Sequence, residues 1–486
     1  MHASSERPQS SASPASIAKQ ILRGLAVLVT LVYWAQPVVA APPNVLIVIA
    51  DQWRAQAFGF AGDPNVKTPN FDRFERECVN FTQAVAGMPV CSPTRASLLT
   101  GQRPQTHGIF INDVPLNTNA VTIAKELKAA GYDTGCIGKW HVDGHGRLNF
   151  IPRERRQGFD YWKVLECAHA YNRSPYYADG PEKLMWEGYD ALAQTRDAQQ
   201  YIRDHGKPGS KPFLLWMAWG PPHNPYETAP EKYRAMYSAE NIKLHPNVPP
   251  EMAKVARGWF AGYYAHCTAL DEYFADLMKT LEDTGLASNT IVVFTSDHGD
   301  MLGSHAQQRK QRPWEESVRV PMLWRVPMSL GIKPRRVNGT MNTEDVMPTL
   351  LSLCGRKIPQ SVEGFDFSGY LRGGADPSGG ATIIRCTSPF GEFTRERGGK
   401  EYREVRTARY SFARDLNGPW LLYDNEKDPF QLYNLVGKPE HAKLQAEMDA
   451  LLKKKLAEQH DEFLPGAEYI KKWGWVVDAS GTASTK

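Results

Sequence analysis

Apolar runs of strand length alternate with helix-like stretches along most of the chain. The runs lack polar alternation, which is typical of parallel strands covered on both faces. They lie at 44–50 (NVLIVIA), 132–138, 212–219 and 291–296. Helical spacing predicts a helix over 121–130 and a long amphipathic helix over 250–284. The core side of the longer helix is expected to hold Val255, Trp259, Tyr263, Cys267, Leu270, Phe274 and Leu277. This order predicts an α/β fold in which helices sandwich a large, mixed but mostly parallel sheet.

The pattern changes after GGADPSGG at 373–380, a segment of turn-forming residues. Beyond it, apolar and polar residues alternate at 401–414 and 419–424, which predicts an antiparallel sheet. A helix is expected over 439–458. We therefore expect two domains, a larger one over 41–375 and a smaller α+β domain over 376–486.

The first forty residues differ from the rest. Three basic residues precede the apolar run LAVLVTLVYWA at 25–35, and small residues at 38, 40 and 41 suit signal peptidase. This pattern predicts a signal peptide over 1–40 and export to the periplasm or the medium, with no stable membrane insertion after cleavage. The alternative is an uncleaved anchor, which is disfavoured because Gln36 and Pro37 end the run before a bilayer-spanning length.

Composition narrows the range of partners. The chain has 486 residues, of which 42% are hydrophobic and 23% charged, as is ordinary for a globular protein. Without residues 1–40, which carry three basic and one acidic side chain, its net charge is +2. Such a near-neutral body gives no reason to expect a nucleic acid partner. The seven cysteines are an odd number for an exported chain, and no zinc-type spacing occurs among them.

Polar residues follow the predicted strands where each one ends. The carboxyl ends of parallel strands share one edge of a sheet, where ligands gather, and the residues expected there are Asp51, Gln52, Lys139, His141, His223, Asp297 and His298. The two aspartates offer hard oxygen ligands for a divalent cation, with Gln52 and His298 as neutral donors. Lys139 and Lys310 are cations that can hold an anion, and the other two histidines can move protons. Together these groups predict a site for an oxyanion ester.

The segment CSPTRASLLTG at 91–101 predicts a helix with Pro93 at its first position and Gly101 at its end. Cys91 would then lie against the helix N-terminus, where free N–H groups and the helix dipole favour negative charge. This is a position for a reactive group or a bound anion.

The same segment resembles the signature of the formylglycine-dependent sulfatases, which belong to the alkaline phosphatase superfamily. The core of that signature, Cys-x-Pro-x-Arg, falls on Cys91, Pro93 and Arg95. Further family motifs occur in the family's order at 44–51, 131–141, 221–226, 295–305, 310–321 and 422–435. The resemblance therefore extends over essentially the whole mature chain.

The resemblance implies a sulfuric ester hydrolase that acts on sulfated carbohydrates or aryl sulfates. In this family a maturation enzyme oxidises the cysteine to formylglycine, and consumption of Cys91 would leave six cysteines. One hydroxyl of the hydrated aldehyde, activated by the metal, attacks sulfur; loss of the proton from the other regenerates the aldehyde and releases sulfate. The resemblance also implies a role for each matching position. His141 assists sulfate release, and His223 protonates the leaving oxygen together with Lys310. Lys139 and Lys310 hold sulfate oxygens and Arg95 steadies residue 91, while the metal is bound by Asp51, Gln52, residue 91, Asp297 and His298.

Two positions depart from the usual family pattern. Many members have Asp-Asp at 51–52 and Asp-Asn at 297–298, where this chain has Asp-Gln and Asp-His. The family ion, calcium, is expected, with manganese or magnesium as alternatives because imidazole suits manganese better. The same pairs occur in some sulfatases and in the related phosphonate monoester hydrolases, so phosphonate or phosphodiester cleavage is the alternative activity. Non-catalytic binding of sulfated glycans is a remote alternative. His145 and Arg147 either reach the sugar or form a solvated turn.

Overall fold

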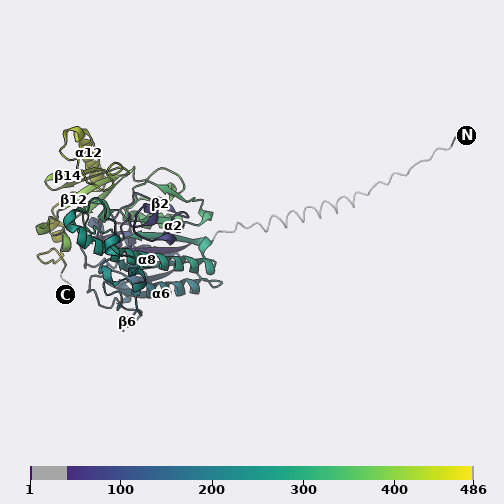
Figure 1. The fold of residues 1–486 in the computed structure, drawn as a ribbon. Coiled ribbons are helices and arrows are strands. Elements are labelled where there is room, and N and C mark those ends of the chain that lie inside the picture. Colours follow the sequence, from purple (N-terminus) through teal and green to yellow (C-terminus); the bar gives the residue numbers. More distant parts are fainter. Residues whose placement is uncertain (3–40, 484–486) are drawn as a thin grey trace. The chain divides into compact units, whose positions relative to one another are not determined.

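The apolar runs predicted at 44–50, 132–138, 212–219 and 291–296 all form strands of one eight-stranded sheet in the computed structural model of the protein (Figure 1). In spatial order the strands are β10 (Arg335–Val337), β2 (Val79–Phe81), β9 (Met322–Arg325), β8 (Thr290–Ser296), β1 (Asn44–Asp51), β7 (Phe213–Pro222), β3 (Asp133–Lys139) and β4 (Tyr161–Leu165). β8, β1, β7, β3 and β4 run parallel, whereas β9 runs antiparallel to both of its neighbours. The sheet is therefore mixed but mostly parallel, as predicted.

The structure describes residues 1–2 and 41–483, so all but the first two residues of the predicted signal segment lie outside it. Within the described residues, no helix combines the length and apolar character that crossing a bilayer requires.

Helices cover both faces of the sheet, and alternate residues of β1 contact each layer. Val45, Ile47 and Ile49 belong to a core that includes α3 (Cys91–Thr100), α5 (Ile123–Ala129) and α10 (Val346–Leu353). Leu46, Val48 and Ala50 belong to a second core with α2 (Pro69–Glu75), α6 (Asp190–His205) and α8 (Ala253–Asp283). In Figure 1, α6 and α8 lie together along one face of the sheet. Both faces of the central strands are thus buried, which explains their continuous apolar sequence.

The predicted core side of α8 is correct over most of the helix and wrong at its start. Val255 is 42% exposed, and the buried positions there are Ala256 and Phe260. The predicted core positions Val255, Trp259 and Tyr263 are spaced four residues apart. Because a helix has 3.6 residues per turn, this spacing drifts off the buried face.

The C-terminal part forms a second sheet, which is antiparallel as predicted. Its strands are β11 (Ala381–Cys386), β12 (Tyr402–Thr407), β13 (Tyr410–Asp415) and β14 (Gly418–Asp424), and α12 (Ala442–Glu458) packs on it. The loop after β11 lies beside the segment that carries Lys310, because Gln311 Nε2 donates to the carbonyl of Phe390 over 3.0 Å. We retain the division at residues 375/376 as a proposal.

The other helices are short, apart from α13 at the end of the chain. They are α4 (Pro104–His107), α7 (Glu231–Arg234), α9 (Glu315–Val318), α11 (Ser368–Leu371) and α13 (Gly466–Trp473), and a two-stranded ribbon joins β5 (Pro175–Tyr176) to β6 (Leu184–Met185).

Candidate active site

The parallel strands bring the predicted site residues to one edge of the sheet. β1 ends on Asp51, β3 on Lys139 and β8 one residue before Asp297. A pocket of about 240 Å³ opens at this edge. The predicted site residues that line it are Cys91, Lys139, His141, Arg147, His223 and Lys310.

Cys91 lies at the start of α3, which begins two residues earlier than the position of Pro93 suggested. Extended backbone at Val90 precedes the helix, so the Cys91 side chain lies at the helix N-terminus as expected. Its sulfur is 3.2 Å from Lys310 Nζ and 3.8 Å from Lys139 Nζ. Although burial and Asp51 oppose ionisation, the two lysines hold the pKa of this thiol well below its usual range. Residue 91 therefore occupies an environment that favours anions.

Four buried side chains form a cluster that could hold a metal ion: Asp51, Cys91, Asp297 and His298, with ligand atoms within 4.8 Å of one another. His298 Nδ1 lies 2.9 Å from the carbonyl of Gly299. A carbonyl can only accept, so Nδ1 carries a proton, and in the neutral ring Nε2 has the lone pair that a metal requires. Nε2 is 3.6 Å from a carboxylate oxygen of each aspartate.

The side-chain oxygen of Gln52 lies near the cluster of possible metal ligands. Its Nε2 donates to Asp300 over 2.7 Å, which fixes the orientation of the amide. Gln52 Oε1 lies 3.4 Å from Lys310 Nζ. The donor set thus consists of carboxylate oxygens, an amide oxygen and an imidazole nitrogen, which fits a hard or borderline divalent cation.

The two carboxylates repel each other, and buried cations oppose that repulsion only in part. Arg95 is 1% exposed and donates to Asp297 through Nε over 3.0 Å, and to Asp51 over 3.3 Å. Lys139 Nζ donates to Asp51 over 2.5 Å. Despite burial, Lys139 leads the groups that hold the pKa of Asp51 well below its usual range, whereas burial and Asp51 raise that of Asp297. A cation between the carboxylates would relieve this imbalance.

His223 is held as a neutral base beside Lys310. Its Nδ1 lies 2.8 Å from the carbonyl of Asn224, and its Nε2 lies 3.0 Å from Lys310 Nζ. The ammonium can only donate, so Nε2 accepts and the proton of the neutral ring is on Nδ1. Burial and the charge of Lys310 lower the pKa of His223 well below its usual range.

His141 contacts a carboxylate that the sequence gave no reason to select. His141 Nε2 lies 3.3 Å from Asp113 Oδ1, and Arg147 donates to both oxygens of Asp113 over 2.9 and 2.6 Å. His145 is 48% exposed, bonds the carbonyl of Asp143 and is not among the residues that line the pocket. Of His145 and Arg147, the two residues that could reach the sugar, only Arg147 lines the pocket.

The residues near the site that sequence analysis missed include Asp300, Asp113, His169 and Cys167, of which the last three line the pocket. Asp300, which orients Gln52, lies inside the motif at 295–305 and could have been found there. Asp113 and His169 belong to no motif; the ring of His169 stacks on His223 with centroids 4.3 Å apart.

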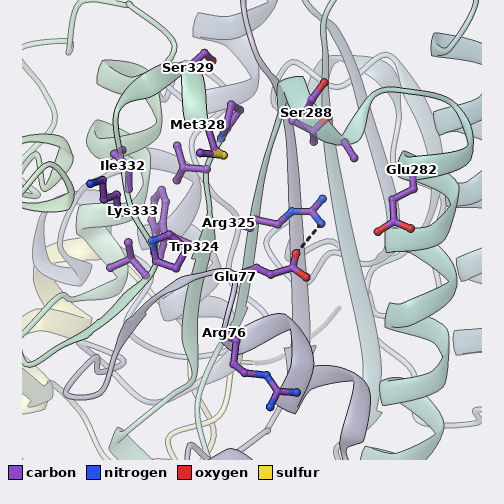
Figure 2. Close-up of a pocket in the computed structure, with 16 residues that line it drawn as sticks. Arg76, Glu77, Glu282, Ser288, Trp324, Arg325, Met328, Ser329, Ile332 and Lys333 are labelled. Carbon is purple, nitrogen blue, oxygen red and sulfur yellow. Dashed lines mark ion pairs between the residues drawn. The ribbon is translucent and has the colours of Figure 1, made fainter.

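A second cavity, of about 680 Å³, lies at the opposite edge of the sheet, near the first residues of β2 and β8 (Figure 2). Figure 2 shows apolar side chains such as Trp324 and Ile332 around it, with an ion pair between Arg325 and Glu77 at 3.7 Å. None of the predicted catalytic residues lines it, so the chemistry belongs to the smaller pocket.

Comparison with known proteins places this site in a family. The sulfatase family model matches residues 43–356, and the model for the C-terminal part of N-sulphoglucosamine sulphohydrolase matches 303–459. An ulvan-active sulfatase of Formosa agariphila is 46% identical over 89% of this chain and 85% of its own. An endo-4-O-sulfatase of Bacteroides thetaiotaomicron is 30% identical, over 85% of this chain and 92% of its own. A solved sulfatase structure, described under the metabolism of multiple glycosaminoglycans by the same bacterium, superposes with a TM-score of 0.78 at 28% identity, over 88% of this chain and 99% of its own. The chain belongs to the sulfatase family and is a sulfuric ester hydrolase.

Proposed function

We propose that the protein removes sulfate from sulfated carbohydrates, using formylglycine at position 91 and a divalent metal. The observation that carries this proposal is the position of Cys91, with the Lys310 ammonium and the His298 imidazole each 3.2 Å from its sulfur. The choice of carbohydrate follows the relatives, one named as ulvan-active and one described under glycosaminoglycan metabolism.

The metal would be held by Asp51, Gln52, Asp297 and His298, together with residue 91. When bound, it supplies a Lewis acid that polarises oxygens beside residue 91. We propose calcium, the ion usual in the family, and the imidazole of His298 makes manganese the first alternative, ahead of magnesium. Arg95 keeps both carboxylates in place through its bonds to Asp297 and Asp51.

Side chains of the protein and formylglycine carry out the remaining chemical steps. Formylglycine supplies a hydrated aldehyde: one hydroxyl attacks sulfur and expels the alcohol, and the other later loses its proton so that the aldehyde re-forms and sulfate leaves. Lys139 and Lys310 hold the sulfate oxygens, since both ammonium groups face residue 91. Lys310 and His223, 3.0 Å apart, deliver the proton that the leaving alkoxide needs. His141 accepts the proton from residue 91 when sulfate leaves.

Two further proposals follow from the start of the chain and from the motif. The segment over 1–40 would direct export to the periplasm or the medium. A formylglycine-generating enzyme would read the segment around Cys91 before the chain folds, because Cys91 is only 1% exposed afterwards.

The test uses protein made with a competent maturation system. Peptide mass spectrometry of the segment holding residues 91–95 should find formylglycine, and the enzyme should cleave a sulfated sugar and an aryl sulfate. An unmodified cysteine in fully active enzyme would overturn the formylglycine mechanism. A preference for a phosphonate monoester would overturn the assignment of substrate class.

A further inference from the structure

Asp113, His141 and Arg147 form a chain of three side chains on one wall of the pocket. Asp113 is 3% exposed and His141 is 2% exposed, whereas Arg147 is 45% exposed. Arg147 donates to both carboxylate oxygens, and one of these oxygens also faces His141 Nε2 at 3.3 Å. Both Asp113 and His141 have left-handed backbone, with φ of 64° and 63°. Such φ values are uncommon outside glycine and are held only where the surroundings fix the backbone.

We propose that Asp113 is the positioning residue for His141, and that Arg147 fixes Asp113 rather than binding the sugar. Asp113 thereby holds the proton of neutral His141 on Nε2 and leaves Nδ1 as the base. This inference rests on the proposed role of His141 in sulfate release.

The direction of the bond follows from the chemistry of the partners. Despite burial, His141 and Arg147 hold the pKa of Asp113 well below its usual range, so the carboxylate is ionised and can only accept. The proton between the two residues is therefore on His141 Nε2. His141 Nδ1 is buried and makes no hydrogen bond of normal geometry among the described residues, with Cys167 as the other group that acts on the ring. When the ring is neutral, Nδ1 is therefore the nitrogen with the lone pair.

The same arrangement favours the protonated ring during sulfate release. Nδ1 takes the proton of the hydroxyl on residue 91, the electrons of that O–H bond form the aldehyde C=O, and the bond to the sulfate oxygen breaks with its electron pair on sulfate. The ring becomes an imidazolium with Asp113 beside it and later gives the proton to water. A carboxylate that orients a catalytic histidine and stabilises its cation is the arrangement of the serine protease triad.

Four charged or titratable groups act on His141. Burial lowers the pKa of the ring, as does Lys139, whereas Cys167 and Asp113 raise it, and the net direction is well above the usual range. The ring is therefore neutral, and able to act as a base, only at a pH above this raised pKa. Glu166 is also near the ring, and burial raises its pKa to about 7. Removal of the Asp113 charge should therefore lower the pKa of His141.

The test compares Asp113→Asn with a matched variant in the same region. The Asp143 side chain is 2% exposed and is held by two bonds from Arg155, but it makes no bond to His141. In metal-loaded, formylglycine-containing enzyme, Asp113→Asn should lower kcat by about 10²-fold, the lower end of what general base catalysis contributes. It should leave KM nearly unchanged, move the acid limb of the kcat profile to lower pH, and accumulate sulfated enzyme in intact mass spectra. Asp143→Asn should do none of these.

A second measurement uses the wild-type protein and tests the inference even if Asp113→Asn folds poorly. ¹⁵N NMR of histidine-labelled, metal-loaded wild-type protein, recorded at a pH above the pKa of His141 and with the His141 signals assigned by His141→Gln, should show the neutral ring protonated on Nε2. A ring protonated on Nδ1 would overturn the inference. So would an unmoved pH profile in folded Asp113→Asn, or equal kcat losses in the Asp113 and Asp143 variants.

The two proposals fail in different ways. If His141→Ala does not accumulate sulfated enzyme, the proposed role of His141 in release is wrong. If His141→Ala accumulates it and folded Asp113→Asn does not, only the role of Asp113 is wrong.

Discussion

The pairing of His223 with Lys310 leads to a prediction about leaving groups. His223 Nε2 accepts from Lys310 Nζ over 3.0 Å, within the range of direct proton transfer. The ring is neutral because burial and Lys310 depress its pKa, so the mobile proton of the pair resides on the lysine. His223→Ala removes the acceptor through which that proton can pass to the leaving oxygen. The contact between Lys310 and residue 91 does not involve His223 and should persist.

The size of the effect depends on how much the leaving group needs the proton. General acid catalysis contributes about 10²–10⁴-fold where protonation is required, or about 2.7–5.4 kcal/mol at 1.36 kcal/mol for each factor of ten. A sugar alkoxide is a poor leaving group and needs most of this contribution, whereas nitrophenolate leaves almost unaided. We expect kcat/KM to fall by roughly 10²–10³-fold on a sulfated sugar and by less than about tenfold on nitrophenyl sulfate.

The assay measures kcat/KM on both substrates with the same preparation of His223→Ala and of wild type. The ratio of the two losses cancels any difference in the fraction of folded or formylglycine-containing enzyme, so it isolates the chemical effect. Equal losses on the two substrates would refute the assignment of proton delivery to His223 and Lys310.

Three further changes test the site and the fold. Cys91→Ala should abolish turnover with little change in the melting temperature, because it removes one sulfur; measurable turnover would contradict the role of residue 91. Asp297→Ala should lose bound metal in elemental analysis, and equal metal content in variant and wild type would show that Asp297 is not a ligand. Burial raises the pKa of Glu404 to about 8, so the folded state holds a proton that the unfolded chain releases near its ordinary pKa. Stability should therefore fall by up to about 4 kcal/mol between pH 5 and 8. Glu404→Gln should remove this loss, and parallel pH profiles of melting temperature would contradict it.

Much of the site could be predicted because it is built from strand ends. Asp51, Lys139 and Asp297 follow or close apolar runs, and parallel strands place their carboxyl ends on one edge whatever the details of packing. The same reasoning fails for residues carried by loops. Asp113 lies between α4 and α5 and His169 lies between β4 and β5, and only the folded backbone brings them to the pocket. His145 and Arg147 are separated by one residue, yet only Arg147 finds a partner in Asp113.

The charges of the pocket give a reason why a carboxylate stands beside His141. Around residue 91, Arg95, Lys139 and Lys310 outnumber Asp51 and Asp297, and a divalent cation between the two carboxylates would make this group more positive. That excess of positive charge suits the binding of a sulfate ester, but it disfavours a base that must itself become a cation, and burial and Lys139 both act to lower the pKa of His141. Cys167 and Asp113 more than offset these two effects. The partner of Asp113, Arg147, is 45% exposed, so water screens the guanidinium more than it screens the buried carboxylate. The site can therefore attract an anion and still let one histidine take up a proton.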